Sequence, residues 1–358
     1  MHAGSTTRRS LLAMLGSGLG LALVGCAPQA AGGAMLSNVG RAGSGRRADD
    51  DGFHGGEQPA PEPAASNAEP PQSPPAPEPP AKPRRPTLDL PARTPGAETG
   101  SAFLERTEGL GRAAMDEAVA QAILEGNVPD YLRTLAPIRL EARGLVATLH
   151  VACDYLAIGS DDDFVRMPMT AAAAQRIANR LGATLPTPKL VDTIYEHAEV
   201  RLPPSFIEGG PTEGTLADYA LHHRKLETHR LRGGHPLGVL TAGHKKDIVL
   251  CERLVERPDR VAIYGWHRRA GDVIQPVSTL HSCRYADYSH GVRLVDQRLE
   301  VGGELLRLSD ALRDPEWAWL LSSEGPLSVT AYPTTLPDYD GRGRTKRRKN
   351  ASRAKKKG

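Results

Sequence analysis

The sequence predicts an α+β fold: a single globular domain with a mostly antiparallel sheet and about five helices. Three observations lead to this prediction. Five segments have helical periodicity or helix caps, and seven or more apolar runs have the length and branching of strands. The strand-like runs concentrate in the second half of the domain. No internal repeat and no regular alternation of strand and helix is present, and this segregation favours α+β over a βαβ arrangement.

Composition places this domain at residues 101–338 of the 358 in the chain, which is ample for a packed core. Before it, residues 1–26 have the composition of an export signal. Arg8 and Arg9 precede an apolar run, Leu11–Val24. That run is shorter than the roughly 20 residues that a membrane-spanning helix needs, so we expect a cleavable segment.

Two short motifs in this segment resemble known export motifs. Residues 7–12, TRRSLL, resemble the twin-arginine signal, although they lack the Phe and Lys usual in its second half. Residues 23–26, LVGC, are similar to the lipobox of bacterial lipoproteins. The resemblance implies a lipoprotein precursor in which Cys26 is lipidated and anchors the protein in the cell envelope. Ala27 resembles the residue found in lipoproteins sorted to the outer membrane. The alternative is an ordinary signal in which Cys26 has no special role.

Residues 27–100 are expected to form a disordered linker. Fourteen of the thirty prolines lie between Pro59 and Pro95, mixed with Ala, Glu and Ser. This composition buries too little apolar surface to offset the loss of chain entropy, and it favours a semi-extended spacer. Such a linker would hold the domain away from a membrane anchor.

Helix caps define the helical elements of the domain. Residues 112–124 form an Ala-rich amphipathic segment that Gly126 ends. Thr170 is an N-cap for the next helix, and Gly182 ends it. The remaining helices are expected at residues 189–198, 216–229 and 316–321.

The expected strands begin with a hairpin, residues 138–142 and 145–153, which turns at Gly144. A second hairpin is expected around Gly302 and Gly303. The remaining strands are predicted at residues 155–158, 238–240, 247–254, 261–264, 273–277 and 292–295.

Residues 339–358 are expected to form a disordered basic tail. Gly341–Gly358 contains ten Lys and Arg and no acidic residue, so with a net charge of +3 the rest of the chain carries −7. The tail favours adhesion to an anionic envelope polymer; a solvated tail without a specific partner is the alternative. Gly341–Gly358 has no aromatic residue to stack on bases, so we expect no specific nucleic acid recognition.

Residues 260–295 carry polar residues at the ends of strand-like runs, where a rigid scaffold commonly presents functional groups. This stretch predicts the functional site. The candidate catalytic residues are His267, His281, Asp287, Ser289 and His290. The candidate substrate-binding residues are His244, Lys246, Trp266, Tyr288 and Arg293.

Metal chemistry is the first possibility for these residues. Two or three His with an Asp suit a catalytic zinc that keeps one position open for water, although no HExxH helix is present. Asp161–Asp163 is a candidate calcium loop, but it lacks the spacing of an EF-hand, which favours a solvated loop. The cofactor is therefore left open.

Nucleophilic catalysis is the second possibility. Cys283 lies near His281 and His290, but it is equally suited to the core or to a disulfide, of which Cys153, Cys251 and Cys283 permit at most one. Residues 289–294, SHGVRL, resemble the SHGC-x-R signature of L,D-transpeptidases, which cross-link peptidoglycan with a cysteine. Valine stands at the place of that cysteine, so no catalytic role follows from the resemblance.

Metal-free acid–base chemistry is the third possibility. Asp287 would orient His290 or His281 as a general base, and the cationic side chains of the site would stabilise an oxyanion. Trp266 and the neighbouring tyrosines suit stacking on sugar rings.

The sequence therefore favours an exported, lipid-anchored hydrolase that acts on a cell-wall or extracellular polymer. The alternative is a binding or scaffold lipoprotein that docks a carbohydrate or peptide without turnover.

Overall fold

Eight α-helices and thirteen strands alternate irregularly along the part of the chain that the structure describes, which confirms the α+β fold. The structure is a computed structural model that describes residues 85–208 and 214–335. These residues belong to one compact unit, Glu78–Gly358. The predicted signal at 1–26 with Cys26, most of the linker and the basic tail at 339–358 lie outside the described residues.

Five of the helices have seven or more residues, and threonine caps begin four of them. They are α1 (Gly100–Arg106), α2 (Arg112–Leu124), α3 (Ala171–Arg180), α4 (Pro188–His197) and α5 (Leu216–Arg232). The predicted cap Thr170 accepts a hydrogen bond from the Ala173 backbone N–H at 3.4 Å. Thr215 forms a reciprocal capping box with Asp218 at the start of α5. Three single-turn helices complete the set: α6 (Arg253–Glu256), α7 (Leu308–Ala311) and α8 (Ala318–Leu321).

The largest sheet is antiparallel and contains both predicted hairpins. Its order is β1 (Leu135–Ala142), β2 (Leu145–Ala152), β12 (Val295–Val301) and β13 (Glu304–Arg307), and β5 (Ala183–Thr184) also pairs with β12. The first hairpin turns at Arg143 and Gly144, whose φ angles are 52° and 81°. Two consecutive positive φ angles are typical of a type I′ turn, which matches the twist of paired strands.

A second sheet carries four of the ten candidate residues: Lys246, Trp266, His267 and His290. Its order is β10 (Asp272–Ser278), β9 (Ile263–Arg269), β8 (Lys246–Ile248) and β11 (His290–Gly291). β8 pairs antiparallel with β9 and parallel with β11. Two small sheets join β3 (Ala157–Gly159) to β4 (Phe164–Arg166), and β6 (Val200–Arg201) to β7 (Thr241–Ala242). Antiparallel pairing therefore predominates, but the strands form several sheets.

Three predicted strands differ from the structure. The strand expected at 238–240 is absent, because these residues form a turn and β7 begins only at Thr241. The strand expected at 247–254 ends at Ile248, because the fully buried residues that follow bond to loops: Val249 N–H to Ala262 O at 3.0 Å, and Leu250 N–H to Pro186 O at 2.8 Å. The strand expected at 292–295 begins only at Val295. A short, fully buried apolar run has the composition of a strand whether or not a partner strand lies beside it.

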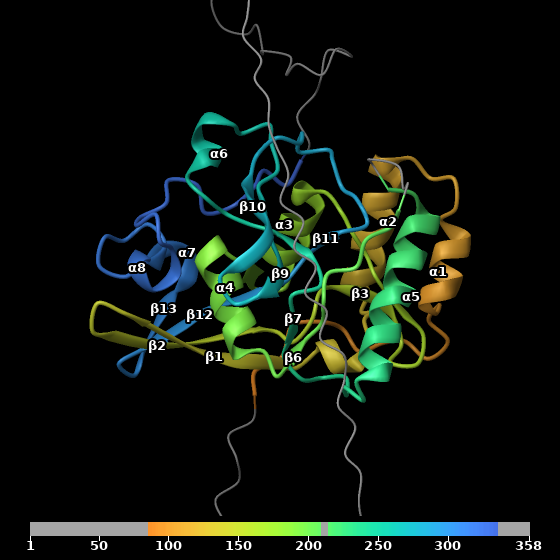
Figure 1. Cartoon of the computed structure of the whole chain (residues 1–358), viewed down its shortest axis with the longest axis horizontal. Coiled ribbons are helices and arrows are strands. Elements are labelled where there is room, and N and C mark those ends of the chain that lie inside the picture. Colours follow the sequence, from red (N-terminus) through yellow and green to blue (C-terminus); the bar gives the residue numbers. More distant parts are fainter. Residues whose placement is uncertain (1–84, 209–213, 336–358) are drawn as a thin grey trace, which may run out of the picture. The chain divides into compact units, whose positions relative to one another are not determined.

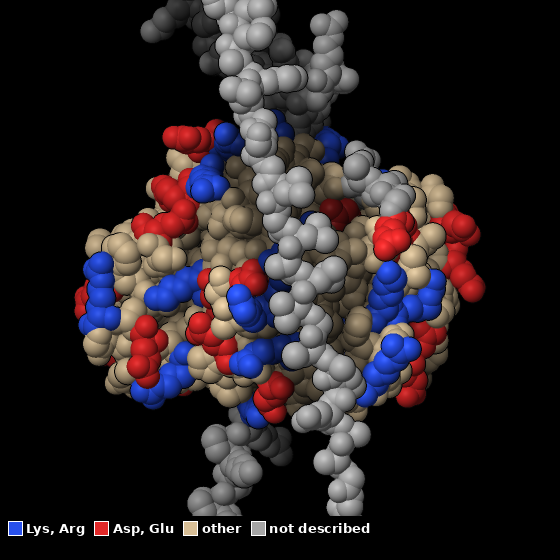
Figure 2. Space-filling view, viewed as in Figure 1, with Lys and Arg blue, Asp and Glu red and all other residues tan. Residues whose placement is uncertain are grey.

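Helices cover both sheets, and one core joins them. α1 packs on β3 and β4, α2 packs on α3, and α4 packs on β9. Figure 1 shows α1, α2 and α5 at one side of these sheets and the β1–β2–β12–β13 sheet at the other, with β9 and β10 between them. Lys and Arg are interspersed with Asp and Glu over the face of the described residues seen in Figure 2. No helix among residues 85–208 and 214–335 is long and apolar enough to cross a membrane.

The folded residues begin before the boundary expected from composition. The Leu88 side chain is 6% exposed, and its backbone N–H bonds to Arg133 O at 2.9 Å. Leu135 N–H bonds to Pro86 O at 2.8 Å, beside the start of β1. Residues 85–99, which composition assigns to the linker, therefore pack on the domain.

Replacing Gly159 by Ala is expected to lower the free energy of unfolding by roughly 3 kcal/mol, because strain and overpacking combine. Gly159 has φ +120°, and a Cβ there would lie 2.1 Å from Asp163 O and 2.6 Å from Gly100 N. Gly144→Ala is the control, since it has φ +81° with nothing within 4 Å and should cost about 1 kcal/mol. Urea unfolding measures both; equal losses would contradict the steric argument.

Candidate functional site

Strand β8 brings the predicted site residues together. His290 is the register partner of Lys246 across β11 and β8, and Gly265 is the partner of Lys246 across β9 and β8. The segments 244–247, 264–267 and 287–290, far apart in sequence, therefore lie side by side. We call the polar residues of these three segments the β8 site.

Asp287, Ser289 and His290 form its first group. Asp287 Oδ1 accepts hydrogen bonds from Ser289 N–H at 2.7 Å and from Ser289 Oγ at 2.5 Å. His290 Nε2 lies 3.8 Å from Asp287 Oδ2, and the His290 side chain is 0% exposed. Ser289 donates its hydroxyl proton to a carboxylate rather than to a histidine, so the geometry does not prepare Ser289 as a nucleophile.

Burial decides the protonation of this group. Burial lowers the pKa of His290 to about 4, against the opposing charge of Asp287, so the ring is neutral at pH 7. Burial also acts to raise the pKa of Asp287, but a protonated His290, the Ser289 hydrogen bonds and the Lys246 ammonium together lower it to about 2. The pair therefore offers a neutral imidazole beside a carboxylate at neutral pH.

Tyr285 links this group to His281. Its hydroxyl donates to Asp287 Oδ2 at 2.9 Å, and its ring stacks on His281 with centroids 3.9 Å apart. The same ring meets His290 edge-on at 5.5 Å. Four of the five predicted catalytic residues thus lie together, with Tyr285 between them.

Two lysines of segment 244–247 border the group. Lys245 is 2% exposed, and its Nζ donates to Tyr288 O at 2.8 Å. Burial, together with the Arg166 charge, lowers the pKa of Lys245 to about 7. Lys246 Nζ lies 4.9 Å from the centre of the Trp266 ring, a cation–π contact.

Trp266 is held in an unusual backbone conformation beneath a covering segment. Its φ is +60°, which is costly for a bulky residue, and its side chain is 3% exposed. Phe206, itself 53% exposed, packs on the Trp266 ring at 4.5 Å. Ile207 N–H donates to Tyr288 Oη at 3.3 Å. Residues 205–207 therefore cover the β8 site from the side of α5.

The fifth predicted catalytic residue, His267, lies in a different environment. Its Nε2 is 2.8 Å from Asp192 Oδ1, and its ring stacks on Tyr195 with centroids 4.4 Å apart. Tyr264 Oη also donates to Asp192, at 2.9 Å. Asp192 stands on α4, 75 residues from His267 in sequence, and nothing in the sequence pointed to it.

Asp247 lies on the same strand as Lys246. Its Oδ2 accepts a hydrogen bond from Tyr155 Oη at 2.8 Å, and burial raises its pKa to about 6. Asp247 Oδ2 would lie 3.6 Å from a Cβ at Gly265, and so would the Cε1 atom of His267. These are ordinary van der Waals distances, so the φ of +111° rather than a lack of space accounts for glycine at position 265.

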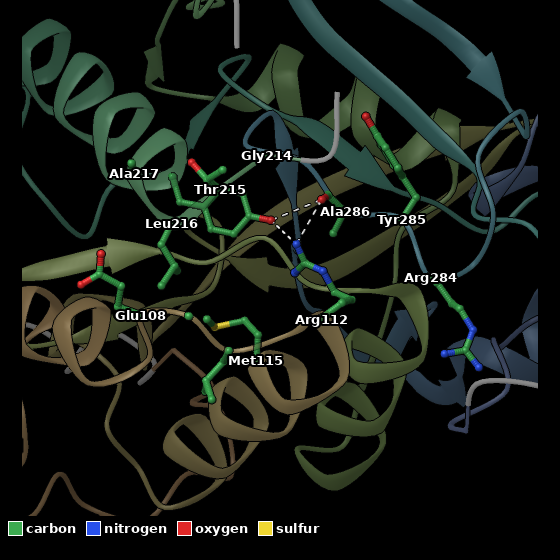
Figure 3. A pocket seen from close by; sticks show the side chains of 13 residues that line it. Glu108, Arg112, Met115, Gly214, Thr215, Leu216, Ala217, Arg284, Tyr285 and Ala286 are labelled. Atoms are coloured by element: carbon green, nitrogen blue, oxygen red, sulfur yellow. Dashed lines mark hydrogen bonds between the residues drawn. The ribbon is translucent and has the colours of Figure 1, made fainter. Parts of the chain in front are cut away.

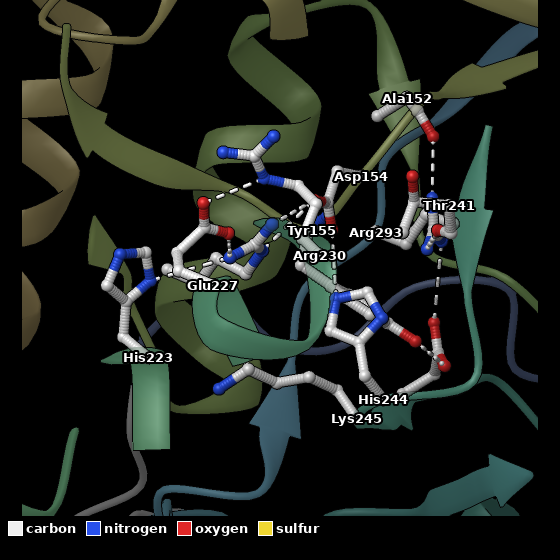
Figure 4. Close-up of polar contacts among 12 residues, drawn as sticks. Ala152, Asp154, Tyr155, His223, Glu227, Arg230, Thr241, His244, Lys245 and Arg293 are labelled. Carbon is white, nitrogen blue, oxygen red and sulfur yellow. Dashed lines mark hydrogen bonds and ion pairs between the residues drawn. The ribbon is translucent and has the colours of Figure 1, made fainter. Parts of the chain in front are cut away.

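His244 and Arg293 belong to a buried network of charges (Figure 4). His244 Nε2 lies 3.1 Å from Asp154 Oδ1, and Arg166 pairs with Asp154 at 2.6 Å. Arg293 donates through Nη1 to Ala152 O and through Nη2 to Thr241 O, both at 2.7 Å. These bonds occupy the guanidinium, so Arg293 holds strands together rather than facing a ligand.

Unpartnered polar atoms gather at the β8 site. Eleven buried side-chain nitrogen and oxygen atoms of the described residues have no hydrogen-bond partner within the protein. Five of them belong to His244, Asp247, Trp266 and His290 of the β8 site. Three more belong to Ser205 of the covering segment and to His222, whose ring lies 5.0 Å from that of Tyr288. Because an unsatisfied buried polar atom costs about 1–3 kcal/mol, such a concentration indicates a place where water or a ligand supplies the partners.

A cavity of about 470 Å³ opens beside the site (Figure 3). It lies between the turn that precedes α2, the first turn of α5 and residues 284–286. Tyr285 belongs both to its wall and to the Asp287 group. The sequence did not indicate this cavity, because three separate segments build it.

The other candidates of the sequence have structural partners. Asp161 and Asp163 accept hydrogen bonds from Tyr131 N–H at 3.2 Å and Ser101 N–H at 3.0 Å, so both are used within the fold. Cys153, Cys251 and Cys283 are buried. No three His, Cys, Asp or Glu side chains of residues 85–208 and 214–335 are grouped to hold a metal ion, so the zinc considered above has no ligand set there.

Comparison with protein-family models, with curated proteins and with solved structures finds no match to this chain.

Proposed function

We propose that the chain is an exported, lipid-anchored hydrolase and that the β8 site cleaves a cell-wall or extracellular polymer. The observation that supports it most is the concentration of unpartnered buried polar atoms around a neutral His290 and an ionised Asp287. Sites of catalysis commonly combine unsatisfied polar groups with displaced pKa values.

His290 acts as the general base in this proposal. A neutral imidazole can accept a proton from water, and the Asp287 carboxylate at 3.8 Å stabilises the imidazolium that forms. The activated water adds to the polymer link, the bond of that link breaks, and the imidazolium of His290 returns its proton to the leaving group. Lys246 and the Trp266 indole N–H lie on the neighbouring strands and stabilise the negative charge that develops on the substrate oxygen.

Entry of a polymer requires that residues 205–207 move. Phe206 and Ile207 contact the site through one ring contact and one 3.3 Å hydrogen bond, which are weak enough to exchange for contacts with substrate. Phe206 occupies the face of Trp266 on which a sugar ring or an apolar side chain would pack.

The rest of the chain supports an envelope location. Cys26 follows a lipobox-like motif, the proline-rich linker supplies reach, and the basic tail suits an anionic polymer. The second candidate is a binding lipoprotein without turnover. The complete burial of Ser289 and His290 favours it, since neither is open to solvent with residues 205–207 in place.

The test uses Glu78–Gly358, which contains the whole compact unit. It is incubated with isolated cell-wall and extracellular polysaccharide preparations, and released fragments are identified by mass spectrometry with and without a chelator. His290→Gln should lower fragment release about 100-fold or more, with co-sedimentation unchanged. His229→Gln is the control, because His229 is exposed on α5. Co-sedimentation of the wild type without any fragment release would favour the binding lipoprotein.

A further inference from the structure

We infer that the cavity beside Tyr285 binds the terminal residues of a short peptide through their free carboxylate. This inference rests on the proposed function, because it makes the cavity the place where the hydrolase holds its substrate. The cavity volume of about 470 Å³ lies within the roughly 300–1,000 Å³ of typical small-ligand sites.

Two arginines contribute positive charge to the lining of the cavity. Arg112, the first residue of α2, and Arg284 both line it, and Glu108 is the one carboxylate among its lining residues. Figure 3 shows Arg112 in the middle, with Arg284 to one side of it and Glu108 to the other. The helix start at Arg112 has no side-chain cap, so its backbone N–H groups add to the positive potential.

Arg112 is only loosely neutralised within the protein. Its nearest carboxylate is Asp116, with Nη1 and Oδ1 3.7 Å apart. Asp116 is itself engaged by Thr170, whose hydroxyl donates to Oδ2 at 2.5 Å, and burial raises the pKa of Asp116. Arg112 Nη2 donates to the Tyr219 hydroxyl and to Ala286 O. The guanidinium is thus fixed in place while much of its charge stays available to an anion.

The remaining lining suits a peptide better than a sugar acid. Leu110, Met115, Leu216 and Ala217 present apolar surface for an alkyl side chain. A uronic acid carries several hydroxyl groups, each of which needs a partner when it is buried, and these apolar residues offer none. The hydroxyls of Thr215, Tyr219 and Tyr285 also line the cavity, but they already donate to Asp218, Ala286 O and Asp287. A peptide needs a cation only for its terminal carboxylate, and arginine suits planar carboxylates.

Tyr285 connects this cavity to the catalytic group. The residue lines the cavity, while its hydroxyl bonds to Asp287 and its ring meets His290. A peptide whose carboxylate sits near Arg112 and Arg284 would therefore direct the preceding part of its chain toward His290. The cavity would select the end of a peptide, and the β8 site would act on a link further along it.

The test measures binding of N-acetyl-dialanine to Glu78–Gly358 by chemical-shift titration in NMR. Its amide and glucuronate are the comparison ligands. We expect saturable binding of the acid alone, weakened about tenfold or more by Arg284→Gln, which removes a charge at the exposed rim. Ala217→Phe should block binding, because Ala217 is exposed on α5 and a larger side chain there fills the cavity without disturbing the core.

The outcomes separate this inference from the proposed function. His290→Gln should bind N-acetyl-dialanine like the wild type, whether or not the wild type cleaves a polymer. Equal binding of the acid and its amide would show that the cavity does not recognise the carboxylate. Binding of glucuronate in place of the dipeptide would show that the ligand is not a peptide. If neither Arg284→Gln nor Ala217→Phe weakens binding, the dipeptide does not bind in this cavity.

Discussion

Replacing Asp154 by Ala is expected to lower the free energy of unfolding by about 3–5 kcal/mol, the usual cost of breaking a buried ion pair. Arg166, 1% exposed, donates through Nε and Nη2 to Asp154 Oδ2 at 3.0 and 2.6 Å. Without Asp154 the guanidinium keeps one carboxylate, Glu227 at 2.7 Å. His244 loses its partner as well. Arg166 comes from β4, Glu227 from α5 and His244 from the residues before β8. Figure 4 shows Asp154 with Glu227 and His244 nearby.

The matched control is Asp130→Ala. Asp130 pairs with Arg133 at 2.9 Å, but its side chain is 78% exposed, so its loss should cost less than about 1 kcal/mol. A second variant separates charge from packing: Asp154→Ala combined with Arg166→Met should recover part of the stability, since no buried charge is left without a partner. Urea unfolding at pH 7 measures all three proteins. If Asp154→Ala and Asp130→Ala cost the same, the network does not act as a buried pair.

The elements that sequence predicts best are those fixed by local chemistry. Helix α2 begins and ends where it was predicted, because its Ala-rich sequence favours a helix and Gly126, with φ 87°, ends it. The Arg143–Gly144 turn and the Thr170 cap follow equally local rules. Residues 249–251 were predicted as part of a strand because they are apolar, but only the tertiary fold decides whether a neighbouring strand is available.

The same difference between local and long-range contacts decides which residues of the candidate site could be predicted. Asp287, Ser289 and His290 are neighbours in sequence, so their grouping followed from the sequence itself. Asp192, which partners His267 from 75 residues away, was not predictable from local spacing. Arg293 was predicted to bind substrate because a cation near histidines often does. Its partners are two backbone carbonyls of other strands, which no side-chain pattern reveals.

Acidification is expected to destabilise the protein steeply below pH 6.5, and buried histidines are the reason. Burial lowers the pKa of His222, His223, His244 and His290, whose ordinary value is 6.5. Below pH 6.5 the unfolded chain takes up protons that the folded chain does not, so stability is fully present above 6.5 and is lost as the pH falls. For His290 the difference between 6.5 and about 4 corresponds to roughly 3 kcal/mol.

The raised pKa of Asp247 has the opposite effect on stability, but the buried histidines outweigh it. Its pKa is raised from 3.8 to about 6, so the folded chain holds a proton there that the unfolded chain releases, and this favours folding as the pH falls through 6. Each fully displaced group changes the stability by about 1.4 kcal/mol per pH unit. Asp116, whose pKa burial also raises, acts in the same direction as Asp247, and these two groups against four histidines leave a net loss of stability between pH 6 and 4.

His290→Gln tests the origin of this loss. Urea unfolding is measured at pH 7, 6, 5 and, where the native state persists, 4. The variant should lose less stability per pH unit than the wild type, by up to about 1.4 kcal/mol, because glutamine takes up no proton on unfolding. His229→Gln, at an exposed position, should keep the wild-type slope. The slope is compared rather than the absolute stability, since the substitution also changes packing. An unchanged slope in His290→Gln would mean that His290 is protonated in the folded protein, and the neutral imidazole proposed as the general base would then not exist at low pH.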